Sequence, residues 1–247
     1  MMNPCILIPI YNHKDTITMV LEQLEPFHLP CIVVDDGSDA ATREVLKRAA
    51  ARYPWVYVTH HAHNAGKGVA LQTGFLHAVS AGYTHAVQID ADGQHRTEDI
   101  ARFIAAAVAN PPALIMGQPV FGPDVPSARY HGRKISRWCA WAETWSLAIG
   151  DPLCGFRVYP LATTVALLKQ KTLGSRMDFE PEIAVRLSWQ GVPIQTIETE
   201  VCYPEAGLSH FRLFWDNVRI SWMHTRLLCG MVWRLPQILR RQRVGPN

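Results

Sequence analysis

The first half of the chain alternates short apolar runs with longer segments of helical spacing, and no other feature restricts the fold as strongly. The short runs are typical of buried strands, and the longer segments are typical of amphipathic helices. This alternation predicts an α/β fold with a Rossmann-like, mostly parallel sheet and helices on both faces. Strands are predicted at residues 5–10, 31–34, 56–59, 86–89 and 114–116, and helices at residues 15–24, 40–52, 68–80 and 98–109.

The second half is less regular, although 247 residues are enough to bury a sizeable core. A stretch rich in Gly and Pro predicts a mobile loop. An aromatic-rich helix, another helix and a late strand are predicted after it, and then a helical tail. The loop is predicted at residues 117–130, the helices at 135–149 and 181–189, the strand at 193–201, the main domain at 1–208 and the tail at 209–247.

Polar clusters follow three of the predicted strands, at residues 9–12, 35–38 and 90–92. In sheets of this kind, ligands bind outside the carboxyl ends of the strands. We therefore expect the three clusters to converge in one cleft.

Asp90 and Asp92 come directly after a buried strand. Two carboxylates in such a place are costly unless something neutralises them. Mg²⁺ or Mn²⁺ does this well, because these ions prefer oxygen ligands and bind carboxylates together with substrate phosphates. Gln94 and His95 extend the set. The alternative is a solvated turn, since Asp and Gly are common turn residues.

Two further segments are candidates for binding a nucleotide. Asp36 can accept hydrogen bonds from a base or a ribose, while Ser38 or Asp39 can cap the next helix; both roles are compatible. Lys67 opens a helix, but its segment lacks the phosphate-loop pattern. We expect Lys67 and nearby backbone amides to lie close to phosphate or sugar oxygens, with a tight turn as the alternative.

Asp151, Arg157 and Glu180 are the candidates for chemistry in the second half. Arg157 could clamp an anionic acceptor or leaving group, and Asp151 could act as a general base if the acceptor is a hydroxyl. The alternative for this pair is a helix end with a structural ion pair. Glu180 precedes a predicted helix, where an acid stabilises the helix dipole, so structural and catalytic roles both stay open.

The tail is basic, with seven arginines and one aspartate after residue 210 in a chain whose formal net charge is +3. Arg212, Arg219 and Arg226 recur at intervals of seven among many aromatic and aliphatic residues. This pattern suits an anionic membrane surface, and the alternative is a helix that covers the core with a solvated arginine face. No uncharged apolar run approaches the ~20 residues that span a bilayer.

The six cysteines form no C-x-x-C pair, which favours free thiols in a reducing compartment. We find no signal peptide in the printed sequence. The expected location is therefore cytoplasmic, as a peripheral protein on the inner face of the plasma membrane.

Five segments together resemble glycosyltransferase family 2, and within it the dolichol- or polyprenyl-phosphate sugar transferases. The resemblance implies a GT-A fold and inverting, metal-dependent transfer of a sugar from a nucleotide-diphosphate sugar to a lipid or lipid-phosphate acceptor. The segments follow the family's order: ILIPIYNH at 6–13, IVVDDGSDAAT at 32–42, NAGKGVALQTGF at 64–75, VQIDADGQH at 87–95 and DPLCGFRVYP at 151–160.

The same resemblance implies roles for individual residues. Asp90, Ala91 and Asp92 would face the diphosphate, and Asp92 and Gln94, with Asp90, would hold Mg²⁺ or Mn²⁺. Asp151 and Arg157 would lie near the acceptor. The nucleotide would be held by Pro9, Tyr11, Val34 and Asp36, with Asn12 of the first polar cluster expected beside them.

Three stretches depart from the family's pattern. His13 stands where the branch usually has Glu, and Gly117-Gln118-Pro119 stands where it often has Gly-Ser-Arg. Residues 205–210 lack the usual Arg and Lys, so His210 and Arg212 are candidates to replace them. The base, the sugar and the acceptor therefore stay undetermined at this stage.

Two other functions fit parts of the pattern. A sugar-nucleotide nucleotidyltransferase shares the sheet and the metal, but it would carry an early Gly-rich loop with Arg or Lys, which does not follow the first predicted strand. A non-catalytic sugar- or membrane-binding module would not need the paired acids. Nucleic acid is not an expected partner.

Overall fold

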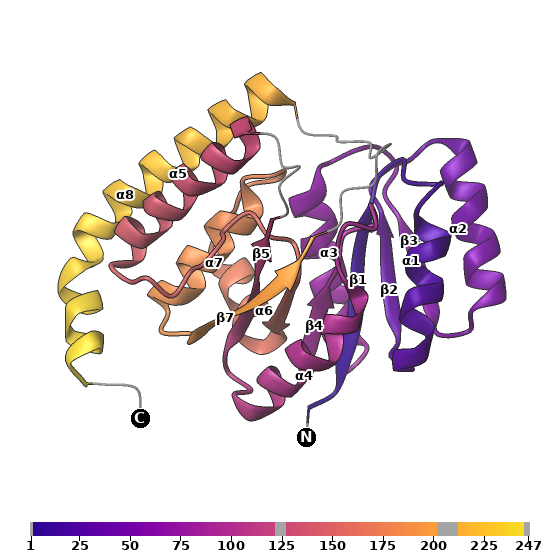
Figure 1. Cartoon of the computed structure of the whole chain (residues 1–247), viewed down its shortest axis with the longest axis horizontal. Coiled ribbons are helices and arrows are strands. Elements are labelled where there is room, and N and C mark those ends of the chain that lie inside the picture. The colour runs from indigo at the N-terminus through magenta and orange to yellow at the C-terminus, as the bar shows by residue number, and fades with distance from the viewer. Residues whose placement is uncertain (1, 122–126, 202–211, 245–247) are drawn as a thin grey trace.

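The computed structural model describes residues 2–121, 127–201 and 212–244, and its centre is one twisted sheet (Figure 1). The strands are β1 (Pro4–Ile10), β2 (Cys31–Asp35), β3 (Val56–His60), β4 (His85–Gln88), β5 (Leu114–Val120), β6 (Arg157–Pro160) and β7 (Ile194–Glu200). Their spatial order is β3-β2-β1-β4-β6-β5-β7. β1 to β4 pair in parallel, β6 runs antiparallel between β4 and β5, and β7 is parallel to β5.

Helices cover both faces of the sheet because successive strand residues point to opposite sides. On β1, Leu7 packs into the core beneath α3, α6 and α7, whereas Ile8 packs into the core beneath α1, α2 and α4. The helices are α1 (Ile17–Leu24), α2 (Ala40–Arg52), α3 (Lys67–Ser80), α4 (Ile100–Ala109), α5 (Ser127–Thr144), α6 (Leu161–Gln170), α7 (Phe179–Trp189) and α8 (Leu213–Val244), with short 3₁₀ turns at Glu25–Phe27 and Thr97–Asp99.

The predicted α/β class, the mostly parallel sheet and the first five strands are confirmed. The sequence did not predict β6 or α6. The strand β6 has only four residues, and it begins at Arg157, which is buried although a charged residue at that place is typical of a loop. The predicted loop at 117–130 is wrong at both ends. Residues 117–120 belong to β5, which finds a partner in β7 along its whole length, and residues 127–130 open α5. Residues 122–126 lie outside the described part of the chain.

The tail forms one helix, α8, which runs beside α5 and also contacts α7 (Figure 1). Ile220, Met223 and Leu227 on α8 are buried in the same core as Leu7. The helix therefore covers the core, as one of the two alternatives predicted. The boundary at residue 208 falls outside the described residues and stays a prediction. Among the described helices, none is both long and apolar enough to cross a membrane.

Candidate active site

The polar ends of β1 and β2 meet at one edge of the sheet, where Ile10 lies opposite Asp35. Asn12 adopts a left-handed conformation with φ of 56°. From there its backbone N–H donates to Ser38 Oγ (3.0 Å), and its side-chain oxygen accepts from the backbone N–H of Asp39 (2.8 Å). Asp39 in turn caps α2 by accepting from Thr42 N (2.7 Å), which confirms the predicted cap.

Asp36 connects this edge to the start of α3. Its two carboxylate oxygens accept the backbone N–H groups of Ala65 (2.9 Å) and Gly66 (2.7 Å). His61 Nδ1 lies 2.9 Å from the same carboxylate. The Asp36 side chain is buried, and these contacts hold the loop before α3 in place. Its predicted contact with a nucleotide stays a prediction.

A cluster of three charged side chains lies where α3, α7 and the end of β4 come together. Lys67 Nζ is 2.7 Å from Asp90 Oδ1 and 3.0 Å from Glu180 Oε2. Burial by itself would lower the pKa of Lys67, but the two carboxylates outweigh it and raise that pKa. Burial would raise the pKa of Asp90, yet Lys67 and His95 hold it well below its usual range. Lys67 and Asp90 are therefore both charged at neutral pH.

Sequence reasoning missed three residues that support this cluster. Gln88 donates from Nε2 to Glu180 Oε1 (2.6 Å), from within β4. His61 holds Asp36, as described above. Gly155 leaves room for Asp90, because a Cβ there would lie 2.4 Å from Asp90 Oδ2. Gln88 is separated from Asp90 by a single apolar residue, and this proximity was its signal in the sequence. The roles of His61 and Gly155 depend on segments that meet only in the folded chain.

Asp92 is the member of the acidic pair with fewer protein contacts. Its Oδ1 accepts from Gln94 N (3.0 Å), and within the described residues its Oδ2 has no hydrogen-bond partner. Ala91 is buried, and its carbonyl accepts from Thr16 Oγ1 (2.6 Å). Asp90, by contrast, is engaged on both oxygens, by Lys67 and by His95 Nε2 at 3.3 Å.

The side-chain oxygens of Asp90, Asp92 and Gln94 fit a divalent cation that also receives ligands from a substrate. Across residues 2–121, 127–201 and 212–244, no three His, Cys, Asp or Glu side chains gather closely enough to hold a metal by themselves. Asp92 offers a carboxylate oxygen that is bound by no described protein group, with the Asp90 carboxylate and the Gln94 side chain in the same turn. Phosphate oxygens would have to complete the coordination.

Arg157 and Asp151 are both tied into the protein. The Arg157 guanidinium has no exposed surface and donates to three backbone carbonyls, those of Pro152 (2.6 Å), Cys154 (2.7 Å) and Glu180 (2.7 Å). It thereby joins the loop before β6 to the start of α7. Asp151 accepts from Arg133 Nε (2.7 Å) and from Leu153 N (2.8 Å). Their predicted roles at an acceptor are not tested by these contacts.

The remaining predicted nucleotide residues lie on the ends of β1 and β2. Pro9 pairs with Val34 in the parallel register, and both side chains are buried. Tyr11 follows β1 and is half-buried. Of the two candidates after residue 200, His210 lies outside the described residues, and Arg212 is exposed, with its backbone N–H bound to Asp216 Oδ2 (2.7 Å).

Comparison with known proteins points in one direction. The sequence model described as "Glycosyl transferase family 2" matches residues 5–171. The chain is 25% identical to the polyprenol monophosphomannose synthase of Mycolicibacterium smegmatis over 224 residues, covering 87% of this chain and 82% of the relative. It is 27% identical to the undecaprenyl-phosphate mannosyltransferase of Micrococcus luteus over 214 residues, covering 79% and 84%.

Solved structures extend the likeness to the fold. The mannosyltransferase PcManGT from Pyrobaculum calidifontis, solved with GDP-Man and Mn²⁺, superposes with a TM-score of 0.59 over 99% of this chain and 76% of that one. The sequences are 17% identical, so this similarity is one of fold.

Proposed function

Because the chain belongs to glycosyltransferase family 2 and has the GT-A fold, we propose that it transfers a sugar from a nucleotide-diphosphate sugar to a polyprenyl-type lipid phosphate, with inversion at the anomeric carbon. The observation that carries the proposal is the ion pair between Lys67 and Asp90 at the carboxyl edge of the sheet, with Asp92 in the same turn as Asp90. The acceptor class comes from the two relatives, which are named for polyprenol and undecaprenyl phosphate.

The donor diphosphate would lie over the turn at residues 90–94. Asp92, with Asp90 and Gln94, would hold Mg²⁺ or Mn²⁺, which offsets the negative charge on the leaving diphosphate when it is bound. Lys67 keeps Asp90 ionised and in place, since its ammonium is 2.7 Å from that carboxylate. The neighbour solved with GDP-Man and Mn²⁺ supports this assignment.

The nucleotide would be held on the ends of β1 and β2. The partly buried Tyr11 and Asn12 would stand at the rim of this site, and the buried Pro9 and Val34 would form its floor. Asp36 would act mainly by fixing the loop that leads to Lys67, because its carboxylate already binds Ala65 N and Gly66 N.

A lipid-phosphate acceptor does not require a protein base, because a phosphate is already ionised at neutral pH. This agrees with the two candidate bases, which are both engaged: Glu180 with Lys67 and Gln88, and Asp151 with Arg133. Arg157 would serve as a positioning residue that holds the loop at 152–155 against α7. Asp151 is the first candidate base, and Glu180 the second, if the acceptor proves to be a hydroxyl.

The reaction would take place at the cytoplasmic face of a membrane, because a polyprenyl phosphate is confined to the bilayer. Cys5, Cys31 and Cys154 are buried free thiols, which is in keeping with a reducing compartment. The nucleotidyltransferase and the non-catalytic module are set aside, since the family match assigns the chain to the glycosyltransferases.

Asp92→Asn tests the proposal. Removing the Asp92 carboxylate should lower donor turnover by about 10²-fold or more while leaving the thermal midpoint unchanged, because Asp92 makes one local hydrogen bond. The measurement is release of nucleoside diphosphate from GDP- and UDP-sugars with Mn²⁺ and a short-chain polyprenyl phosphate. The exposed Asp15→Asn is the matched control. Turnover at the wild-type rate by Asp92→Asn would refute the metal role.

A further inference from the structure

We propose that the outward side of α8 is a bilayer-binding surface that lies in the plane of an anionic membrane. This surface, here called the α8 stripe, deepens the proposed function and rests on it only because a lipid phosphate is presented at a bilayer. Its members are exposed aromatic and aliphatic side chains: Phe214, Trp215, Val218, Trp222, Val232 and Trp233.

The α8 stripe is the side of the helix opposite to the core. Met223 and Leu227 are at most 1% exposed and face the core, whereas Trp222 is 64% exposed and Trp233 is 86% exposed. With ~100° of rotation per residue, the members of the stripe all fall within about a third of a turn, centred opposite Met223 and Leu227. The helix is therefore apolar on two opposite sides, and within the described residues only one of them packs against the core.

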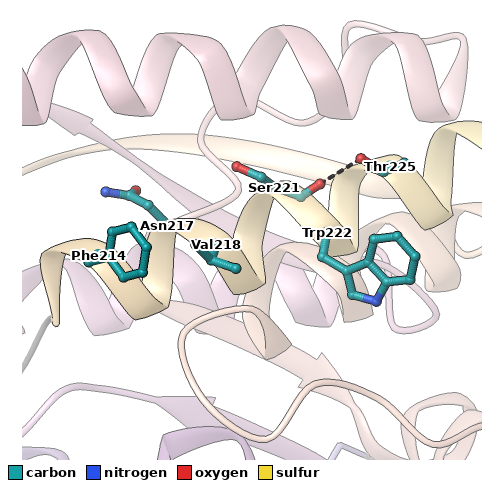
Figure 2. Close-up of a pocket in the computed structure, with 6 residues that line it drawn as sticks. All are labelled: Phe214, Asn217, Val218, Ser221, Trp222 and Thr225. Carbon is teal, nitrogen blue, oxygen red and sulfur yellow. Dashed lines mark hydrogen bonds between the residues drawn. The ribbon is translucent and has the colours of Figure 1, made fainter.

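A shallow groove follows the first half of the stripe. It has a volume of about 650 Å³, and Phe214, Val218 and Trp222 succeed one another along it (Figure 2). Ser221 and Thr225 lie at its border, where the Thr225 hydroxyl donates to the Ser221 carbonyl (2.9 Å). Large aromatic side chains beside small polar ones fit the boundary between lipid headgroups and acyl chains.

Helix α5 carries further exposed apolar side chains beside α8. It packs beside α8, where His224 Nδ1 lies 2.7 Å from Glu143 Oε1. Ile135 and Trp138 on α5 are also exposed, at 58% and 59%. Contiguous exposed apolar side chains on a folded domain mark a site that binds another surface.

The positive charge of the arginines beside the α8 stripe favours an anionic membrane as its binding partner. Arg219 and Arg226 are about 40% exposed and lie on one flank of the stripe, and Arg240 is exposed further along. Asp216 is the one acid of α8, and it is buried. A second copy of the chain would therefore bring arginines against arginines, whereas lipid phosphates would pair with them.

Vesicle co-sedimentation of the full chain tests the surface. Wild-type protein should bind vesicles of phosphatidylcholine with phosphatidylglycerol and bind pure phosphatidylcholine more weakly. Trp222→Ser with Trp233→Ser should reduce binding to both by about tenfold or more. Arg219→Gln with Arg240→Gln should reduce binding to the anionic vesicles alone, by about fivefold per arginine.

Matched controls lie far from the stripe in the fold. Tyr57→Ser on β3, which is 54% exposed, and Arg48→Gln on α2 should bind as the wild type does. Circular dichroism checks that each variant is folded, and Trp233→Ser alone replaces the double variant if that one unfolds. Nucleoside diphosphate release without vesicles reports the transferase activity separately, so loss of membrane binding with normal release isolates the stripe.

Two results would overturn the inference. The first is unchanged vesicle binding by folded stripe variants. The second is a wild-type dimer in solution that dissociates on Trp222→Ser with Trp233→Ser, because that places a second copy on the stripe. A chain that binds vesicles through the stripe but turns over no nucleotide sugar would instead contradict the proposed function and leave the membrane surface standing.

Discussion

Lys67 is the residue on which the charge balance of the site depends. Asp90 and Glu180 come from segments 90 residues apart in the sequence, and the Lys67 ammonium lies between them at 2.7 and 3.0 Å. Without this cation, the partly buried Asp90 carboxylate and the buried Glu180 carboxylate would repel one another. The lysine therefore keeps Asp90 negative, as a site for a cation and a diphosphate requires.

Gly155→Ala should lower turnover by about tenfold or more with little loss of stability. The new Cβ would lie 2.4 Å from Asp90 Oδ2, so the carboxylate must move away from its place beside Lys67 and His95. Small displacements of a catalytic group have large effects on rate. Steady-state turnover together with thermal unfolding measures both quantities.

The control for this substitution is Gly132→Ala in α5, where nothing lies within 4 Å of the added Cβ. It should leave turnover unchanged. Equal turnover in Gly155→Ala and Gly132→Ala would show that the position of Asp90 does not matter.

Between elements, α5 and α8 are joined by one buried polar pair. The His224 ring and the Glu143 carboxylate are at most 6% exposed and lie 2.7 Å apart. Burial raises the pKa of Glu143, and although His224 opposes this, the net shift is upward, with Glu182 adding to it. The folded protein therefore binds the Glu143 proton more tightly than the unfolded chain does.

Unfolding free energy should consequently fall as pH rises from the ordinary carboxyl range through the folded pKa of Glu143. Glu143→Gln removes this titration while keeping an oxygen that can accept from His224. We expect the variant to gain stability relative to wild type as pH increases from about 4 to about 7. Urea unfolding across this pH range measures the difference in unfolding free energy. Glu44→Gln, at an exposed position on α2, is the control. A difference independent of pH would contradict the assignment.

At the scale of the whole molecule, α8 is part of the hydrophobic core and not an appendage of a domain that is complete without it. A chain ending at residue 208 would lose Ile220, Met223 and Leu227, each worth about 1.5–3 kcal/mol when fully buried. Their sum of about 5 kcal/mol or more rivals the whole stability of a typical domain. We expect this truncated chain to aggregate on size-exclusion chromatography. A chain ending after Arg240, which keeps these residues, should elute as the full chain does.

Local patterns account for most of the sheet and for the location of the site. Buried apolar runs such as residues 5–10 and 31–34 end in polar clusters, and parallel pairing brings those ends to one edge. The cap at Asp39 was also predictable, because it depends on residues three apart. Among the elements that escaped prediction is β6, whose antiparallel place between β4 and β5 depends on partners far away in the chain.

The sequence alone determined the fold class, the family and the identity of the acidic pair, because those follow from local spacing and composition. Only the tertiary structure decided what each charge does. It paired Lys67 with Asp90 and Glu180, buried Arg157 against backbone carbonyls, and turned one apolar side of α8 inward and the other outward. The physical reason is that a charge or an apolar surface is balanced by whatever packs against it, and long-range contacts alone specify that neighbour.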